Sequence, residues 1–212
     1  LRVPAVAGEL HRPSSRHDNE QIRDNRSVRG RDSIGHGLAR RRIFHERQDK
    51  GYSQVSLTVA CVLSPGPTYN RSHVTRLEVM VSRHLHQPYR FVCVDDSPLP
   101  GWWSKISLFQ PERFNGRVLY LDLDVTVVGS LDDLADYPYP FCAIRDYQYP
   151  LQINSSVMAW DAGVADCVYN DFTPDVMEML HGDQNFIHEK MNTTTFPKQW
   201  CPSYKAHVLP SG

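Results

Sequence analysis

The sequence predicts a single α/β domain in which helices flank a β-sheet, and two stretches carry this prediction. The first is the apolar, β-branched run from Gly116 to Gly129, whose composition is typical of a strand buried on both faces. The second is a β-α-β unit, with a strand pattern at 55–63, helical spacing of apolar residues at 72–85 and another strand pattern at 91–94. Because such a unit joins parallel strands, part of the sheet is expected to be parallel.

Capping residues and prolines mark the expected ends of the helices. Ser72 is a candidate N-cap of the first helix, and Pro88 ends it. A short helix is expected at 102–109, closed before Pro111. The remaining expected elements are a helical turn at 131–134, strands at 141–144 and 155–160, and helices at 164–172, after Thr173 as N-cap, and from Asp183 onward.

Two carboxylates interrupt the central apolar run. Asp122 and Asp124 are two residues apart, so a strand would present both on one face, near its end. A buried carboxylate needs a cation or several hydrogen-bond donors. Magnesium and manganese suit this pair, because they take few protein carboxylates and fill their other positions with water and phosphate oxygens. We therefore interpret the pair as a metal or phosphate site, with a solvated Asp-x-Asp loop as the alternative.

The charge distribution separates the first 50 residues from the rest. Residues 1–50 hold 12 Lys and Arg against 7 Asp and Glu, and the remainder holds 11 against 17. The polar composition and weak periodicity predict a disordered basic arm at 1–50 and a folded domain at 51–212. The arginines of the arm would suit nucleic acid, but acids are mixed among them and aromatic residues are not interleaved. No nucleic-acid partner is therefore expected.

The sequence predicts a cytoplasmic protein with reduced thiols. No apolar run is long enough to span a bilayer, and the first ten residues do not have the pattern of a signal peptide. The cysteines are odd in number and none are paired at metal-ligand spacing, so free and mostly buried thiols are expected. They are Cys61, Cys93, Cys142, Cys167 and Cys201.

Four short motifs occur in an order that resembles a known family. They are Trp103-Ser104-Lys105, Arg117 to Asp124, Asn154-Ser155-Ser156-Val157-Met158 and Gly182-Asp183-Gln184-Asn185-Phe186. Over residues 54–207 the chain resembles a bacterial nucleotide-sugar-dependent glycosyltransferase of the GT-A fold, closest to family 8, which includes glycogenin and the lipopolysaccharide galactosyltransferases. The resemblance implies a Rossmann-like mixed sheet flanked by helices. It also implies sugar transfer from a nucleotide-diphosphate sugar, in the first place a UDP-sugar, to a glycan, lipid or protein acceptor.

The resemblance implies roles at the diphosphate end of the donor. Asp122 and Asp124 match the Asp-x-Asp motif that holds Mn²⁺, or Mg²⁺, on the donor diphosphate. Lys105 matches a basic residue that contacts donor phosphate or sugar, and Tyr69 falls where an aromatic often packs near the nucleotide base. A solvated helical lysine is the alternative for Lys105.

Other matches fall at the sugar end of the donor. Asn154 and Ser155 match a motif that lines the sugar site, and Asp183 and Gln184 match an Asp-Gln pair below the anomeric carbon. The family retains anomeric configuration, and Asp183 is the one candidate nucleophile. The alternatives are a turn residue for Asn154 and a helix N-cap for Asp183. The tryptophans at 102, 103 and 200 are expected to pack in the core rather than to stack on an acceptor.

One departure from the family leaves two other interpretations open. The family's His-x-Gly-x-x-Lys-Pro-type motif, which supplies a third metal ligand, does not occur before Gly212, so we expect a C-terminally truncated chain. A non-catalytic, nucleotide-binding remnant is one alternative. A phosphatase of the haloacid dehalogenase type is the other, because residues 122–126 resemble its Asp-x-Asp-x-Thr loop. Against it, that loop follows the first strand in the phosphatases, and Val125 stands where they usually have glycine.

Overall fold

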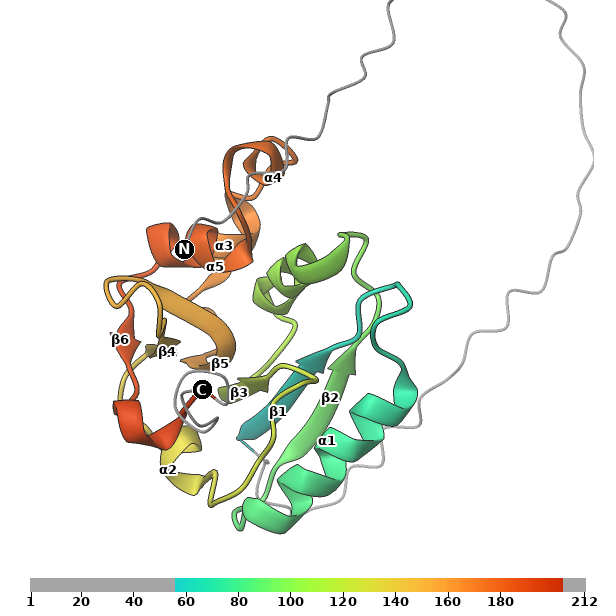
Figure 1. Ribbon diagram of the computed structural model, residues 1–212, viewed down its shortest axis with the longest axis vertical. Helices are drawn as coiled ribbons and strands as arrows, with labels where there is room; N and C mark the ends of the chain where they lie inside the picture. Colours follow the sequence, from blue (N-terminus) through green and yellow to red (C-terminus); the bar gives the residue numbers. More distant parts are fainter. Residues whose placement is uncertain (1–55, 204–212) are drawn as a thin grey trace, which may run out of the picture. The chain divides into compact units, whose positions relative to one another are not determined.

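The computed structural model describes residues 56–203, and the predicted basic arm lies outside the described residues. The described chain forms a six-stranded sheet with helices on both faces (Figure 1), which confirms the predicted α/β class. The strands lie in the order β2-β1-β3-β5-β4-β6. Their bounds are β1 Leu57–Val62, β2 Arg90–Val94, β3 Arg117–Leu121, β4 Phe141–Arg145, β5 Ile153–Asp161 and β6 Thr194–Thr195.

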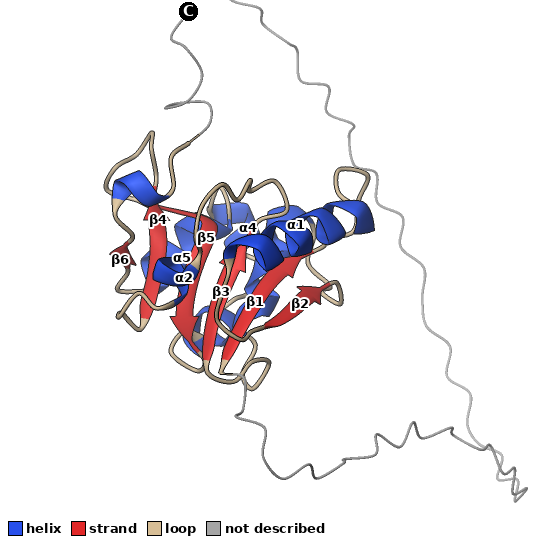
Figure 2. Cartoon of the chain, turned by 90° about the horizontal axis from the view of Figure 1, so that it is seen from below, coloured by secondary structure: helices blue, strands red, loops and turns tan. Residues whose placement is uncertain are grey.

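The sheet is mixed, and its direction changes in the middle. Strand β1 pairs in parallel with β2 and β3, as the β-α-β pattern predicted, whereas β5 runs antiparallel to both β3 and β4. The short strand β6, which the sequence did not predict, pairs in parallel with β4. Figure 2 shows the strands side by side. Because β1 and β3 end at the edge where β5 begins, the loops after β1 and β3 meet the start of β5.

Helices cover both faces of the sheet, and each face has its own apolar cluster. On one face, α1 (Arg71–His84) and α2 (Asp132–Ala135) pack on β1 and β3. The other face is covered by the 3₁₀ helix η1 (Gly101–Phe109), α3 (Asp166–Asn170) and α5 (Asp183–Lys190): η1 contacts β1, α5 contacts β5, and α3 packs on η1 and α5. The remaining helices are α4 (Val176–Met179) and η2 (Lys198–Trp200).

Two predicted helix caps are wrong. Helix α1 is capped by Asn70 instead of Ser72, because the Asn70 side-chain oxygen accepts hydrogen bonds from both the N–H and the hydroxyl of Ser72. Thr173 does not cap α4 with its side chain. Its carbonyl accepts the N–H of Val176 in a turn that precedes the helix, so α4 begins three residues after Thr173.

The central strand is shorter than the apolar run that predicted it. Strand β3 ends at Leu121, and a turn follows in which the N–H of Val125 donates to the carbonyl of Asp122 over 3.1 Å. Leu123 and Val127 are buried beyond the strand, so they owe their apolar character to packing beneath a loop. Asp122 and Asp124 therefore lie in a turn at the strand's end and not within the strand.

The start of β3 depends on a glycine in the left-handed region. Gly116 has a φ of 73°, and a Cβ there would lie 2.2 Å from the carbonyl oxygen of Ser56. The same oxygen accepts the N–H of Arg117 over 2.7 Å, so the approach joins β1 to β3. We expect Gly116→Ala to lower the free energy of unfolding by about 2 kcal/mol or more, from the left-handed backbone and the clash together. Urea denaturation measures this loss.

Gly129 provides the matched control for this prediction. It lies beyond the other end of the same sequence run, has no left-handed φ, and a Cβ there would meet nothing within 4 Å. Gly129→Ala should change the free energy of unfolding by less than about 0.5 kcal/mol. Equal effects of the two substitutions would contradict the role of Gly116.

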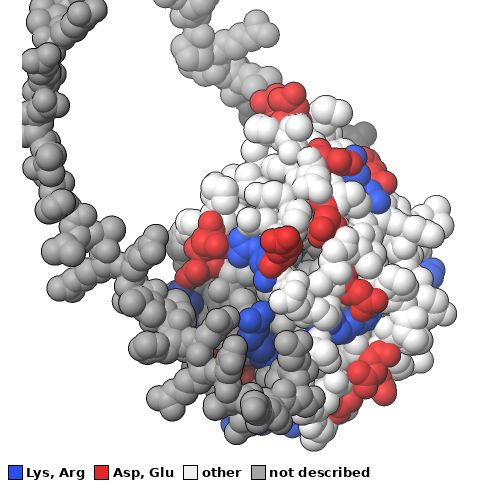
Figure 3. Space-filling view, turned by 180° about the vertical axis from the view of Figure 1, so that it is seen from behind, with Lys and Arg blue, Asp and Glu red and all other residues white. Residues whose placement is uncertain are grey.

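The described surface and thiols are ordinary for a folded domain. On the face in Figure 3, acidic and basic side chains are interspersed among uncharged ones. All five cysteines are free, as expected, but only Cys61 and Cys142 are buried, and the other three are partly exposed. Within residues 56–203, no helix is both long and apolar enough to cross a membrane.

Candidate active site

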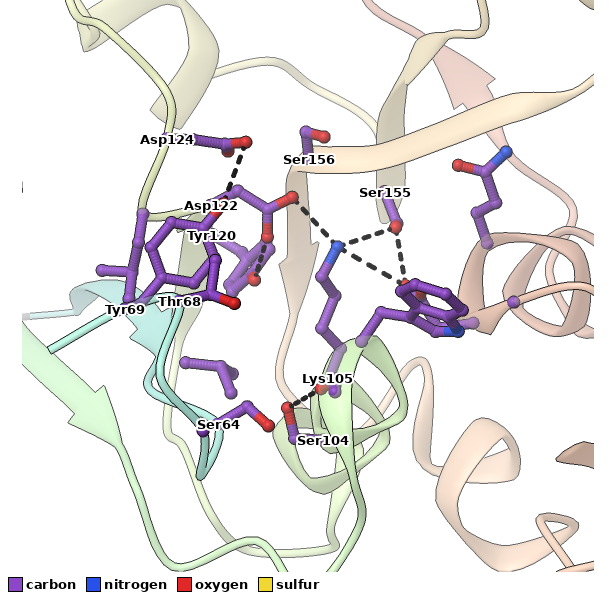
Figure 4. A pocket seen from close by; sticks show the side chains of 18 of the residues that line it. Ser64, Thr68, Tyr69, Ser104, Lys105, Tyr120, Asp122, Asp124, Ser155 and Ser156 are labelled. Atoms are coloured by element: carbon purple, nitrogen blue, oxygen red, sulfur yellow. Dashed lines mark hydrogen bonds and ion pairs between the residues drawn. The ribbon is translucent and has the colours of Figure 1, made fainter. Parts of the chain in front are cut away.

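A cavity of about 660 Å³ opens where β1 and β3 end and β5 begins. Its walls come from the loop after β1, from η1, from the end of β3, from β5 and from the start of α5 (Figure 4). Seven of the eight residues predicted as site residues line this cavity. They are Tyr69, Lys105, Asp122, Asp124, Ser155, Asp183 and Gln184.

A buried lysine lies at the centre of the cavity wall. The Lys105 ammonium contacts Asp122 Oδ2 over 3.0 Å, Ser155 Oγ over 3.1 Å and Asp183 Oδ2 over 3.6 Å (Figure 4). Lys105 is only 9% exposed, so the solvated-lysine alternative is wrong. Burial alone would lower the pKa of Lys105, but the carboxylates of Asp122 and Asp183 outweigh it and raise the pKa. The lysine therefore stays charged in the cavity.

The first turn of η1 positions Lys105 in the cavity wall. Gly101 has a φ of 54°, which permits the tight entry into the helix, and the Ser104 hydroxyl donates to the Gly101 carbonyl over 2.6 Å. Almost all of the helix is buried, from Trp103 to Phe109. Lys105 is thus held by a packed element rather than by a surface loop.

The end of β3 places a phenol beneath the first aspartate. Tyr120 and Asp122 are two residues apart, and the Tyr120 hydroxyl donates to Asp122 Oδ1. Burial and the neighbouring Asp122 carboxylate raise the pKa of Tyr120 well above its usual value, so the phenol stays a donor. Asp122 therefore has one oxygen bound by Tyr120 and the other by Lys105.

The second aspartate is more open. Asp124 is exposed at the cavity wall, and its Oδ2 accepts a hydrogen bond from the Tyr69 hydroxyl over 3.2 Å. Burial and the Asp124 carboxylate raise the pKa of Tyr69, which keeps this donor protonated. The loop after β1 and the turn after β3 are joined by this bond.

Asp183 and Gln184 enter the cavity from the first turn of α5. Asp183 Oδ2 accepts the Ser155 hydroxyl over 2.6 Å, and burial raises the pKa of Asp183 although Lys105 and Ser155 oppose the rise. Gly182 occupies the N-cap position, so the N-cap alternative for Asp183 is wrong. The Gln184 amide lies 3.5 Å from the buried Asp146, which also accepts the N–H groups of Gln148 and Tyr149.

Asn154 does not join the other site residues. Its side-chain oxygen accepts the N–H of Ser156 over 2.9 Å, and it is not among the residues that line the cavity. The pairing of β5 with β4 shifts here, from Met158 opposite Ala143 to Asn154 opposite Ile144. Such an irregularity redirects side chains, and here Ser155 and Ser156 face the cavity in place of Asn154.

Three residues near the cavity were missed by sequence reasoning. Tyr120 had a signal, because strand alternation puts it on the same face as Asp122. Asp146 had none, because its link to Gln184 joins the loop after β4 to helix α5, 38 positions further along the chain. Trp102 was expected in the core, but it is 58% exposed and lines the cavity, whereas Trp103 is buried against Phe172.

Comparison with known proteins shows the class of fold. No protein-family model matches the sequence, and no curated protein matches it. Its mixed sheet flanked by helices is that of a GT-A-like glycosyltransferase fold. The chain is similar to the crystal structure of the glycosyltransferase GlyE of Streptococcus pneumoniae TIGR4, with a TM-score of 0.50 and 16% sequence identity. The match covers 69% of this chain and 46% of that one, so the chain spans less than half the length of that structure.

Proposed function

We propose that this chain transfers a sugar from a nucleotide-diphosphate sugar, with a UDP-sugar as the first candidate donor, to an acceptor. One observation carries the proposal. A buried, charged lysine and two carboxylates of one turn, Asp122 and Asp124, line the same cavity, with Asp183 beside the lysine. Loss of a diphosphate leaving group requires that developing negative charge be neutralised. The likeness in fold to a glycosyltransferase supports the same chemistry.

A divalent cation fits the carboxylate turn as part of the proposal. Asp124 is exposed with one hydrogen bond to Oδ2, so it has acceptor capacity left, and Asp122 lies two residues away on the same wall. Among the described residues, no group of three or more His, Cys, Asp and Glu could hold a metal. In the proposal, Asp122 and Asp124 would hold Mn²⁺ or Mg²⁺, and donor phosphate oxygens and water would supply the other ligands. The cation would neutralise charge on the diphosphate.

The chain's own residues supply binding and orientation. The Lys105 ammonium is available to phosphate oxygens next to Asp122, and Tyr120 fixes that carboxylate from beneath. The Ser155 hydroxyl and the Asp183 carboxylate form one hydrogen-bonded pair suited to sugar hydroxyls. Asp183 also places negative charge where an oxocarbenium-like centre would develop, by analogy with glycoside hydrolysis. Gln184, held by Asp146, extends the same wall.

Two finer parts of the proposal, membership of family 8 and retention of anomeric configuration, rest on the sequence resemblance. The cytoplasmic location rests on the free thiols, and the separate basic arm rests on the charge and composition of residues 1–50. The phosphatase alternative is less favoured, because the Asp122 turn follows the third strand within residues 56–203 and the fold is similar to that of a glycosyltransferase.

Calorimetric titration of the full chain with UDP, with and without Mn²⁺, tests the proposal. We expect UDP to bind and Mn²⁺ to strengthen the binding, and UMP to bind more weakly because it lacks the β-phosphate. GDP and ADP test the choice of base. Failure of all three nucleoside diphosphates to bind, together with Mg²⁺-dependent hydrolysis of p-nitrophenyl phosphate, would replace the proposal by the phosphatase.

A further inference from the structure

We propose that Trp102 is the platform on which the sugar ring of a carbohydrate acceptor stacks, which makes the acceptor a glycan. The proposal rests on the proposed function and narrows its acceptor from three chemical classes to one. The observation behind it is a large aromatic side chain that is 58% exposed on the wall of a cavity. Exposed aromatic surface in a concave site is typical of ligand contact.

The fold does not require an exposed indole at this position. The neighbouring Trp103 is 7% exposed and packs on Phe172 with ring centroids 5.7 Å apart, so it supplies the aromatic packing of η1. Trp102 makes no comparable ring contact within the described residues. Its indole therefore remains available for a ligand.

The Trp102 indole lies beside Gly182. A Cβ built on Gly182 would meet Trp102 Nε1 at 3.4 Å and its Cδ1 at 3.7 Å, which is ordinary van der Waals distance. Gly182 immediately precedes Asp183, the carboxylate paired with Lys105 and Ser155. Trp102 thus lies next to the residues that would hold the transferred sugar.

The position of the Trp102 indole favours stacking on the acceptor over stacking on the nucleobase or the transferred sugar of the donor. The diphosphate groups of the proposed donor belong near Lys105, Asp122 and Asp124, and the transferred sugar near Ser155 and Asp183. Trp102 lies beside Gly182, next to Asp183 in the chain, and is far more exposed than either Lys105 or Asp183. A ring that stacks on Trp102 would therefore belong to a molecule that enters from solvent after the donor has bound. A sugar ring suits this position, because its apolar C–H face can pack on an indole.

The experiment compares variants of the full chain on a glycan array, in the presence of UDP and Mn²⁺, with UDP titrations in parallel. Wild-type protein should bind at least one glycan, and Trp102→Leu should lower that signal about 10-fold, the usual scale for loss of one aromatic stacking partner. Trp102→Phe, which keeps a flat ring, should lose less. Trp200→Leu is the control, because Trp200 is 37% exposed and is not among the residues that line the cavity.

The possible results distinguish failure of the role proposed for Trp102 from failure of the proposed function. No glycan binding by wild-type protein that binds UDP, or equal binding by Trp102→Leu, overturns the role of Trp102 and leaves the proposed function standing. An equal loss of UDP affinity in Trp102→Leu would assign the indole to the nucleobase and overturn the proposal. Failure of wild-type protein to bind any nucleoside diphosphate would refute the proposed function itself. Thermal unfolding separates these results from misfolding, since Trp103→Leu should lower stability and Trp102→Leu should not.

Discussion

Lys105→Met is expected to lower the free energy of unfolding by about 3 to 5 kcal/mol, the usual cost of removing one partner from a buried ion pair. The side chains concerned are little exposed, at 11% for Lys105, 19% for Asp122 and 6% for Asp183. Methionine fills much the same volume, so the loss comes from two carboxylates left without their cation. Urea denaturation at neutral pH measures it.

Two further variants show whether the charge is the cause. Lys190→Met removes an exposed lysine that contacts Asp171 over 2.8 Å, and it should cost no more than about 1 kcal/mol. The double variant Lys105→Met with Asp183→Asn removes a cation and an anion together, so it should recover part of the loss. A cost below about 1 kcal/mol for Lys105→Met alone would show that the lysine is not a structural counter-ion.

Asp124→Ala is expected to reduce sugar transfer by on the order of 100-fold and to abolish the Mn²⁺-dependent gain in UDP affinity, while stability stays within about 0.5 kcal/mol. The separation of the two effects follows from the structure. Asp124 is exposed and accepts one hydrogen bond, from Tyr69. Release of UDP from a panel of UDP-sugars measures transfer, and calorimetry measures affinity.

The controls separate charge from local structure. Tyr69→Phe removes only the hydrogen bond to Asp124 and should reduce transfer far less. Asp133→Ala removes an equally exposed carboxylate from α2, away from the cavity wall, and should leave transfer unchanged. Full Mn²⁺-dependent UDP binding by Asp124→Ala would contradict the assignment of the carboxylate turn. Asp122→Ala should lose stability as well as binding, because Lys105 and Tyr120 both bind that carboxylate.

The sequence predicted the order of elements better than their ends. Local patterns were enough for the β-α-β unit, because α1 buries Val74, Leu77 and Val81 at helical spacing and β1 is a short run buried along its whole length. The run from Gly116 to Gly129 predicted too long a strand. Composition does not distinguish apolar residues that pack beneath a loop from those of a strand. The two-residue strand β6 was missed because its pairing with β4 is a long-range contact without a local signal.

For the site as well, local spacing predicted some features and long-range packing determined the others. The spacing of Asp122 and Asp124 predicted that both would face one place, and both line the cavity although they lie in a turn. The position of Lys105 between two carboxylates depends on how η1 and α5 pack, which periodicity does not encode. Ser155 lines the cavity as predicted, whereas Asn154 does not, and the pairing of β4 with β5 shifts at this point of the strand.

The interactions around Lys105 also bear on when the site forms during folding. The hydrogen bonds that hold the site together join residues that are far apart in the chain. The separation is 55 positions for Tyr69 and Asp124, 50 for Lys105 and Ser155, and 28 for Ser155 and Asp183. Contacts of high sequence separation are slow to form, because chain entropy must be lost before they contribute. A partly folded chain therefore has no binding site. Any nucleotide that recognises the assembled cavity stabilises only the native state, so its binding reports complete folding.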